Sequence, residues 1–146
     1  AGRSIPRQSR RPGGDFDPVR CFLGRLAGER EEAMRAVTRI LFLDEDGEKF
    51  FGEGPCRLLH AVEETGSLRG AAQSMGMAYT KALKLIRHAE KALGFALTAR
   101  TAGGRAGGGS CLTPEGKEWL TQYEAYRDAC IRANRQLYLE FFPQQR

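Results

Sequence analysis

The fold is decided by residues 67–93, which have the sequence SLRGAAQSMGMAYTKALKLIRHAEKAL. Ser67 can accept a hydrogen bond from the free amides of a helix start, and Gly76 ends this helix after about two turns. A second helix is predicted from about Ala78, with Gly94 as its C-terminal stop, so only a tight turn fits between the two. The apolar stripes of the two helices comprise Leu68, Ala71, Ala72, Met75, Ala82, Leu85, Ile86, Ala89 and Leu93.

The spacing of small residues in this stretch is typical of two-helix units that enter DNA. Such units need a small residue where the first helix crosses behind the second, and a glycine in the turn between them. Counting Leu68 as the first position, Ala72 is fifth and Gly76 is ninth. The residues that project from the start of the second helix, the end that meets base edges in the major groove, are Tyr79, Thr80, Lys81, Leu83 and Lys84. The pattern predicts a helix-turn-helix that binds duplex DNA.

Several of these side chains have an alternative explanation. Tyr79 and Leu83 fall off the apolar stripe, so we expect both at the surface, with Leu83 in contact with thymine methyl groups. The lysines can also be ordinary solvent-facing charges. Lys81 and Lys84 lie near the helix start, where a helix in the groove is closest to DNA, whereas Lys91 lies near the far end. We therefore favour DNA contacts for Lys81 and Lys84 and a solvent-facing position for Lys91.

The distribution of charge supports a nucleic-acid partner. The chain of 146 residues carries a formal net charge of +5. Residues 40–65 hold seven acids against two bases, a net of −5, whereas residues 66–111 hold seven bases against one acid, a net of +6. A merely solvated basic face is the alternative, but a concentrated field of one sign usually meets a partner of the opposite sign.

Two elements are predicted before the helix-turn-helix. Residues 37–43 and 49–51 are β-branched and aromatic and flank an acidic turn, which predicts a β-hairpin. A helix is predicted over residues 55–65, with Pro55 at its first position, because a helix start needs no amide donor there.

A second hairpin and a long helix are predicted after it. Residues 97–101 and 111–113 are short extended stretches around a Gly-rich, basic tip at residues 103–109. Thr113, followed by Pro and Glu, is a strong helix start, and the helix should run to about Glu140. The fold class expected is therefore mainly α with small β-hairpins, a winged helix-turn-helix with an N-terminal hairpin and a long C-terminal helix.

The last helix carries aromatic and apolar residues at heptad spacing. These residues are Trp119, Tyr123, Tyr126, Cys130, Ala133 and Leu137. Such spacing is typical of a helix that packs against another helix, and we favour a homodimer seam over packing on the domain's own core. We accordingly predict a DNA-binding domain at residues 34–116 and a dimerisation helix at residues 117–146.

Residues 1–33 combine Arg, Pro, Gly and Ser with little apolar periodicity, which predicts a disordered basic arm. Two interpretations stay open. The arm can lie along phosphates, or it can be no part of the native protein. The second follows because residues 28–32, just before Ala33 and Met34, can be back-translated into a purine-rich ribosome-binding site, which would make Met34 the true start.

Residues 54–123 resemble the N-terminal DNA-binding domain of the bacterial molybdate-responsive regulators of the ModE type, which is itself similar to the LysR-type winged helix. The matching stretches are GSLRGAA at residues 66–72, GMAYTKA at 76–82, GGRAGGGS at 103–110 and LTPEG at 112–116. The resemblance implies a transcription regulator that acts as a homodimer. It implies DNA contacts by Ser67, Tyr79, Thr80, Lys81 and Lys84, with Arg105 on the wing. We add Arg69 and Ala78, which lie at the starts of the same two helices, to the predicted DNA-binding residues.

Two positions depart from that pattern, since Ala78 stands where the family usually has Ser and Leu83 where it usually has Trp. The family's base preference is therefore not carried over. The sequence ends at Arg146 without the second domain that holds the oxyanion in this family, so we expect no molybdate bound to this chain and no other cofactor.

Other functions find little support. Cys56 and His60 lie one helical turn apart, but no third ligand is near them in sequence, so we predict ordinary packing and no metal. The Gly-rich tip lacks the Lys-Ser/Thr pair of a phosphate loop, and His88 has no carboxylate or nucleophile at useful spacing, so no enzyme activity is predicted. The four cysteines show no C-x-x-C pair and no apolar run suffices for a membrane span, which favours a cytoplasmic protein. The rival function is a protein-interaction module with residues 40–65 as its partner surface.

Overall fold

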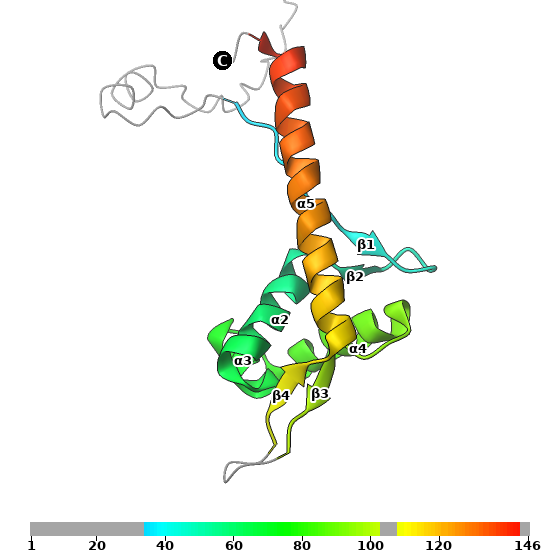
Figure 1. Cartoon of the computed structure of the whole chain (residues 1–146), viewed down its shortest axis with the longest axis vertical. Helices are drawn as coiled ribbons and strands as arrows, with labels where there is room; N and C mark the ends of the chain where they lie inside the picture. The colour runs from blue at the N-terminus through cyan, green and yellow to red at the C-terminus, as the bar shows by residue number, and fades with distance from the viewer. Residues whose placement is uncertain (1–33, 103–107, 144–146) are drawn as a thin grey trace, which may run out of the picture. The chain divides into compact units, whose positions relative to one another are not determined.

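The computed structural model of the chain describes residues 34–102 and 108–143, so the predicted arm at residues 1–33 and the wing residue Arg105 lie outside the described residues. Helices and two small antiparallel β-hairpins make up a winged helix-turn-helix, as the sequence predicts (Figure 1). The elements are β1 (Phe42–Leu43), β2 (Lys49–Phe51), α2 (Glu53–Thr65), α3 (Leu68–Ser74), α4 (Tyr79–Leu93), β3 (Thr98–Arg100), β4 (Ser110–Leu112) and α5 (Pro114–Phe141).

The first hairpin is present with the acidic turn predicted for it. Asp44 organises this turn, since its carboxylate Oδ1 accepts hydrogen bonds from the amides of Asp46 at 3.0 Å and Glu48 at 2.8 Å. The strand β1 is shorter than predicted and begins only at Phe42. The physical reason is that β2 has just three residues, so the residues before Phe42 find no partner in the ladder.

The helix α2 begins at Glu53, two residues earlier than predicted, and Pro55 is its third residue rather than its first. Pro55 is still tolerated because none of the amides of a first turn has an acceptor within the helix. The Cys56 amide closes this turn by donating to the Gly52 carbonyl at 3.1 Å. Gly66, in the left-handed conformation, ends the helix where the sequence predicts.

The helix-turn-helix has the predicted bounds. The Ser67 hydroxyl caps α3 by accepting a hydrogen bond from the Gly70 amide at 2.9 Å. Gly76 lies in the turn with φ +65°, a conformation that L side chains rarely adopt. Ala78 is the N-cap of α4, and Gly94 ends that helix.

The core lies among α2, α3 and α4 and is completed by the hairpins and the first turns of α5. Ala72, predicted at the helix crossing, is 1% exposed, and a side chain this small lets α3 approach its neighbours closely. The buried hydrophobic residues are Phe51, Cys56, Leu58, Leu59, Ala61, Val62, Leu68, Ala71, Ala72, Ala82, Ile86, Ala89, Leu97, Leu112, Leu120 and Tyr123.

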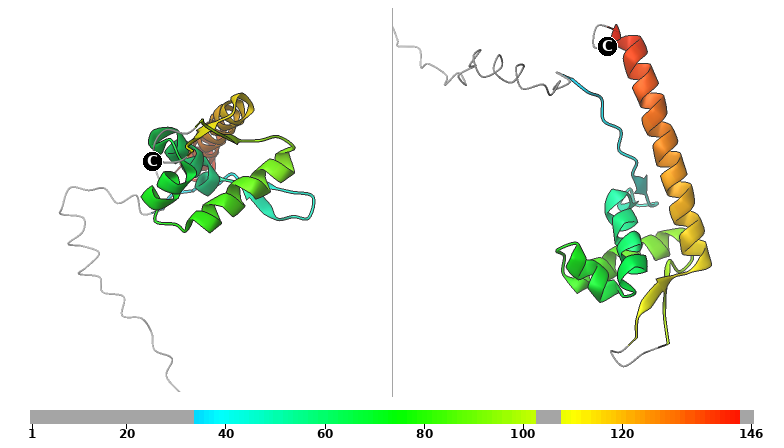
Figure 2. Two further views of the ribbon diagram at one scale, coloured as in Figure 1. Left: turned by 90° about the horizontal axis from the view of Figure 1, so that it is seen from below. Right: turned by 60° about the vertical axis from the view of Figure 1, so that its left-hand side comes forward.

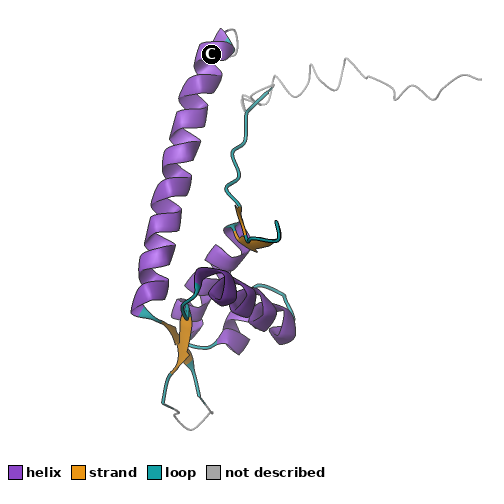
Figure 3. Cartoon of the chain, turned by 90° about the vertical axis from the view of Figure 1, so that its right-hand side faces the viewer, coloured by secondary structure: helices purple, strands orange, loops and turns teal. Residues whose placement is uncertain are grey.

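The wing hairpin, β3 with β4, is joined to the helix-turn-helix at its base. The Ser110 amide donates to the Gly66 carbonyl at 2.8 Å, and Glu90 of α4 accepts from the Leu97 amide at 3.0 Å. A Cβ on Gly109 would lie 2.5 Å from the Gly66 carbonyl oxygen, so only glycine permits this approach. Figure 3 shows the hairpin projecting from the end of the domain opposite to the far end of α5.

The long helix α5 begins as predicted, with the Thr113 hydroxyl accepting from the Gly116 amide at 2.9 Å. Its first turns pack on the domain and the rest extends beyond it, as the right-hand view of Figure 2 shows. No helix in the described part of the chain has the length and apolar character needed to cross a membrane.

Two of the six residues assigned to a dimer seam contact the domain itself, since Tyr123 lies in its core and half-buried Trp119 packs against that core. Tyr123 is 2% exposed, with its ring centroid 4.9 Å from that of Phe51. The Trp119 ring lies 5.3 Å from Phe42 and 5.4 Å from Phe51. The aromatic residues of the first hairpin therefore cover the start of the heptad stripe. Tyr126 also lies near Phe42, with ring centroids 6.2 Å apart, but it is 54% exposed. A seam stays a prediction for Tyr126, Cys130, Ala133 and Leu137.

Candidate nucleic-acid interface

The helix α4 has one buried face and one exposed basic face. Ala82, Ile86 and Ala89 are at most 2% exposed and fix the helix against the domain. Thr80, Lys81 and Lys84, which the sequence predicts to contact DNA, are all exposed within its first turns. The burial of the first face determines which residues the second presents, so these three side chains form a group at the start of the helix.

Arg69 and Tyr79 join the beginnings of α3 and α4. The Arg69 guanidinium lies over the Tyr79 ring, 4.8 Å from its centroid, an arrangement that is favourable because the ring face is electron-rich. Arg69 is exposed, so this contact places a further positive charge at the beginning of α4. The two predicted residues thus lie together, a contact that sequence spacing does not indicate.

Tyr79 and Leu83 are less exposed than the sequence predicts. Both are half-buried and pack against the core, so the expectation that they fall outside the apolar surface is wrong for each. The reason is that the buried stripe of α4 is broader than one row of residues, which is usual for a helix packed against several neighbours. Contact between Leu83 and thymine methyl groups stays a prediction for the part of the side chain that is exposed.

The two helix starts differ in their caps. The Ser67 oxygen is used for the cap of α3, and a hydroxyl in that role can still donate its own hydrogen to a phosphate. Ala78 is exposed and provides no side-chain cap for α4. The missing cap follows from the sequence, because Ala78 stands where the ModE-type family usually has a serine.

An acidic turn lies against the far part of α4. His88 Nε2 is 2.8 Å from Asp44 Oδ2, and the hydrogen bond from His88, with those from the Glu48 and Asp46 amides, lowers the pKa of the Asp44 carboxyl. His88 follows Lys84 by four residues, one turn along the same face. The Asp44 carboxylate therefore faces His88 in the second half of α4, where Arg87 and Lys91 are also exposed. Sequence spacing missed this pair because Asp44 precedes His88 by 44 residues.

The comparisons with known proteins agree with this geometry. Residues 56–117 match the family described as bacterial regulatory helix-turn-helix protein, lysR family. The matched segment runs from α2 through the wing to the start of α5, so it covers the helices and the hairpin described above.

Three curated relatives are similar to part of this chain. The Molybdenum transport protein ModE of Azotobacter vinelandii is 33% identical over 109 residues, which are 72% of this chain and 40% of that protein. ModE of Herbaspirillum seropedicae is 40% identical over 63 residues, 43% of this chain and 23% of that protein. The Molybdenum-pterin-binding protein MopB of Rhodobacter capsulatus is 35% identical over 68 residues, 47% of this chain and 25% of that protein.

The chain thus spans less than half the length of these relatives. Residues 56–117 therefore form a winged helix-turn-helix of the LysR type, and the chain is similar over part of its length to ModE-like proteins.

Proposed function

We propose that this protein regulates transcription by binding specific sequences of duplex DNA as a homodimer. In this proposal α4 enters the major groove with its first turns, and the wing lies over the flanking backbone. The observation that carries it is the exposed basic start of α4, with Thr80, Lys81 and Lys84 held outward by the buried opposite face. We further expect the protein in the cytoplasm, where a bacterial chromosome lies.

The charged residues divide into two groups by their distance from the start of α4. Lys81 and Lys84, in the first turns, are placed to contact base edges, because a recognition helix contacts bases with its N-terminal residues. Arg69, at the start of α3, and Arg100, exposed on β3, are placed for phosphate contacts. Arg105 at the wing tip is assigned the same role from the sequence alone.

The dimer we propose uses the part of α5 beyond the core. Tyr126 and Leu137 are 54% and 52% exposed and continue the stripe that begins with buried Tyr123. Large apolar side chains along one helix face are best covered by the same face of a second copy, because a two-fold interface is self-complementary. Two α4 helices related in this way would enter successive major grooves about 34 Å apart on a pseudo-palindromic site.

The test is the binding of the full chain to fluorescent duplexes, with specific sites chosen from a random library. If each subunit neutralises about four phosphates, log K should fall against log salt with a slope near −7. The library should yield sites with two related halves about one helical turn apart. Absence of binding to any duplex at low salt would reject the proposal and favour a protein-interaction module with residues 40–65 as its surface.

A further inference from the structure

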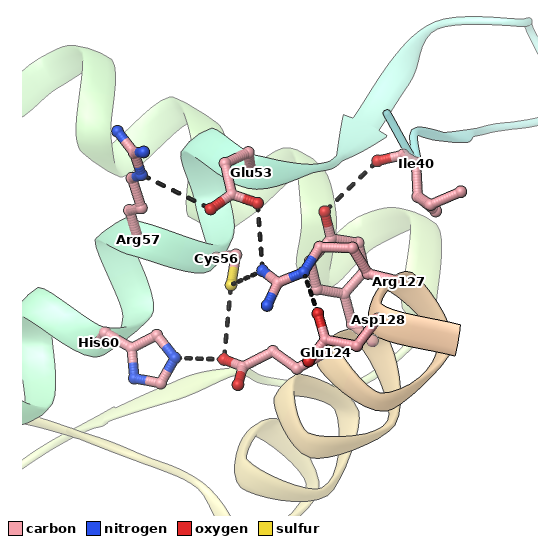
Figure 4. Close-up of polar contacts among 9 residues, drawn as sticks. Ile40, Glu53, Cys56, Arg57, His60, Glu124, Arg127 and Asp128 are labelled. Atoms are coloured by element: carbon pink, nitrogen blue, oxygen red, sulfur yellow. Dashed lines mark hydrogen bonds and ion pairs between the residues drawn. The ribbon is translucent and has the colours of Figure 1, made fainter. Parts of the chain in front are cut away.

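Three metal-ligating side chains converge at a place separate from the proposed DNA interface. Cys56 and His60 lie one turn apart on α2, and Glu124 reaches them from α5 (Figure 4). Their ligand atoms all lie within 4.8 Å of one another. The Glu124 Oε1 atom is 3.6 Å from Cys56 Sγ and also forms a hydrogen-bonded ion pair with His60 Nε2.

The separation of Cys56 Sγ and Glu124 Oε1 is that of two ligands in a tetrahedral metal site. Zinc binds thiolate sulfur, imidazole nitrogen and carboxylate oxygen at about 2.0–2.3 Å, which places ligand atoms about 3.3–3.8 Å from one another. The Cys56–Glu124 pair already has this separation. A metal ion would replace the hydrogen bond between His60 and Glu124, and both groups would keep their orientation toward the same point.

A fourth coordination position would face open space. A pocket of about 220 Å³ is lined by His60 and Glu124, together with Glu63, Lys117 and Thr121. A water molecule or a small anion bound to the metal fits in such a pocket, and the pocket provides the route by which the ion would enter. The site therefore combines three protein ligands with one exchangeable position.

The nearby positive charge is already neutralised by acidic side chains, so it would not repel a bound cation. Arg127 is the nearest base, with Nη1 3.9 Å from Cys56 Sγ, but it is held by Glu53 at 3.1 Å and Asp128 at 3.0 Å. Burial is the main reason that the pKa of the Cys56 thiol is raised to about 12. A metal ion bound there would displace the thiol proton, as coordination by a dication usually does.

We propose that Cys56, His60 and Glu124 form a binding site for one divalent transition-metal ion of the zinc class. The ion would link α2 of the DNA-binding domain to α5, the helix that carries the proposed dimer stripe. The sequence predicts no metal here because Cys56 and His60 lack a nearby third ligand, and Glu124 follows His60 by 64 residues. This inference does not depend on DNA binding.

Cobalt titration of the full chain, first stripped of metal with a chelator, tests the site directly. We expect saturation at one Co²⁺ per chain, with the visible bands of tetrahedral coordination and a thiolate-to-cobalt charge-transfer band. Addition of Zn²⁺ should remove both. Absence of saturable Co²⁺ binding would overturn the proposal, whatever the result of the DNA experiments.

Matched variants identify the ligands. The chain has four cysteines, so a variant in which Cys21, Cys111 and Cys130 are all serine retains Cys56 alone and should keep the charge-transfer band. Cys56→Ser in the otherwise natural chain should lose it. Persistence of the band in Cys56→Ser, or its loss in the triple variant with circular dichroism unchanged, would overturn the assignment.

His60→Gln provides a second test in case Cys56→Ser unfolds, because the His60 side chain is 48% exposed and its replacement leaves the core intact. Groups that only orient a ligand contribute about 10- to 100-fold to metal affinity, so loss of a ligand should cost at least that much. Glu124→Gln should weaken binding similarly. Unchanged Co²⁺ affinity in His60→Gln would exclude the three-residue site.

Discussion

Single residues decide whether each helix of the helix-turn-helix has a side-chain cap at its N-terminus. Ser67 provides a hydroxyl cap for α3, whereas Ala78 provides none for α4, the helix proposed to enter DNA. The Asp44–His88 pair holds the acidic turn against the second half of α4. The first difference was predictable from sequence, since caps are local. The second was not, because it joins side chains that only the tertiary fold brings together.

Ala78→Ser should stabilise the protein. A serine at the N-cap can accept from the free amides of the first turn, which is typically worth about 1 kcal/mol. Urea unfolding should therefore shift to a higher midpoint. Ala92→Ser, at an exposed position near the end of the same helix, is the control and should give no gain. Equal midpoints for Ala78→Ser and the unmodified chain would show that α4 does not start here.

Asp44→Asn should change how stability depends on pH. The pKa of Asp44 is lowered in the folded chain, so its carboxylate stabilises the fold above the ordinary value of 3.8 and ceases to do so as the pH falls below it. The Tm difference between the unmodified chain and the variant should thus be largest near neutral pH and shrink in acid. Asp46→Asn changes the charge of the same turn and serves as the control. A pH-independent Tm difference for Asp44→Asn would contradict the assigned ion pair.

At the scale of elements, the sequence predicts helices better than it predicts what their faces cover. The stops at Gly66 and Gly94 and the turn at Gly76 are local backbone signals, and the structure has all three. Trp119 and Tyr123 show the limit, because heptad spacing identifies an apolar helix face without naming the surface that covers it. Here the partner is a hairpin whose aromatic residues lie some seventy positions earlier in the chain.

Gly109→Ala should disturb the wing. The new Cβ would lie 2.5 Å from the Gly66 carbonyl oxygen and 2.7 Å from Thr101 Oγ1, so the backbone must shift. Overpacking of this kind typically costs about 1–3 kcal/mol, and the shift should also lower affinity for DNA. Gly108→Ala is a matched control, since its Cβ meets only the Thr101 carbonyl at 3.5 Å. Urea unfolding and duplex titration of both variants measure the two effects, and equal behaviour would contradict the docking of the wing on Gly66.

At the scale of the whole molecule, α5 connects the core to the predicted dimer. Its first turns carry Leu120 and Tyr123 into the core, and its later turns carry the exposed Tyr126 and Leu137. One helix can therefore fix both the position of α4 within a subunit and the distance between two subunits. Cys56, His60 and Glu124 lie where α5 meets α2, so a bound metal would strengthen the connection between these two roles.

Leu137→Lys and Tyr126→Lys should convert a dimer into a monomer. A lysine on a two-fold seam would face its own copy, and like charges in contact destabilise such an interface. Sedimentation equilibrium measures the change. Gln136→Lys adds the same charge beside the stripe and should leave the dimer intact. A natural chain that is monomeric at every concentration, or a monomer produced by Gln136→Lys as well, would contradict the seam.

The central claim is that the first turns of α4 contact the bases of a specific site. The most direct measurement compares the affinity of Lys81→Ala, Lys84→Ala and Lys91→Ala for the selected site and for random duplex DNA. Loss of a contact to a base edge should cost about 1–3 kcal/mol on the selected site, with a much smaller loss on random DNA. Lys91→Ala, in the last turn of α4, should change little on either duplex. Unchanged affinity for the selected site in both Lys81→Ala and Lys84→Ala would contradict the account.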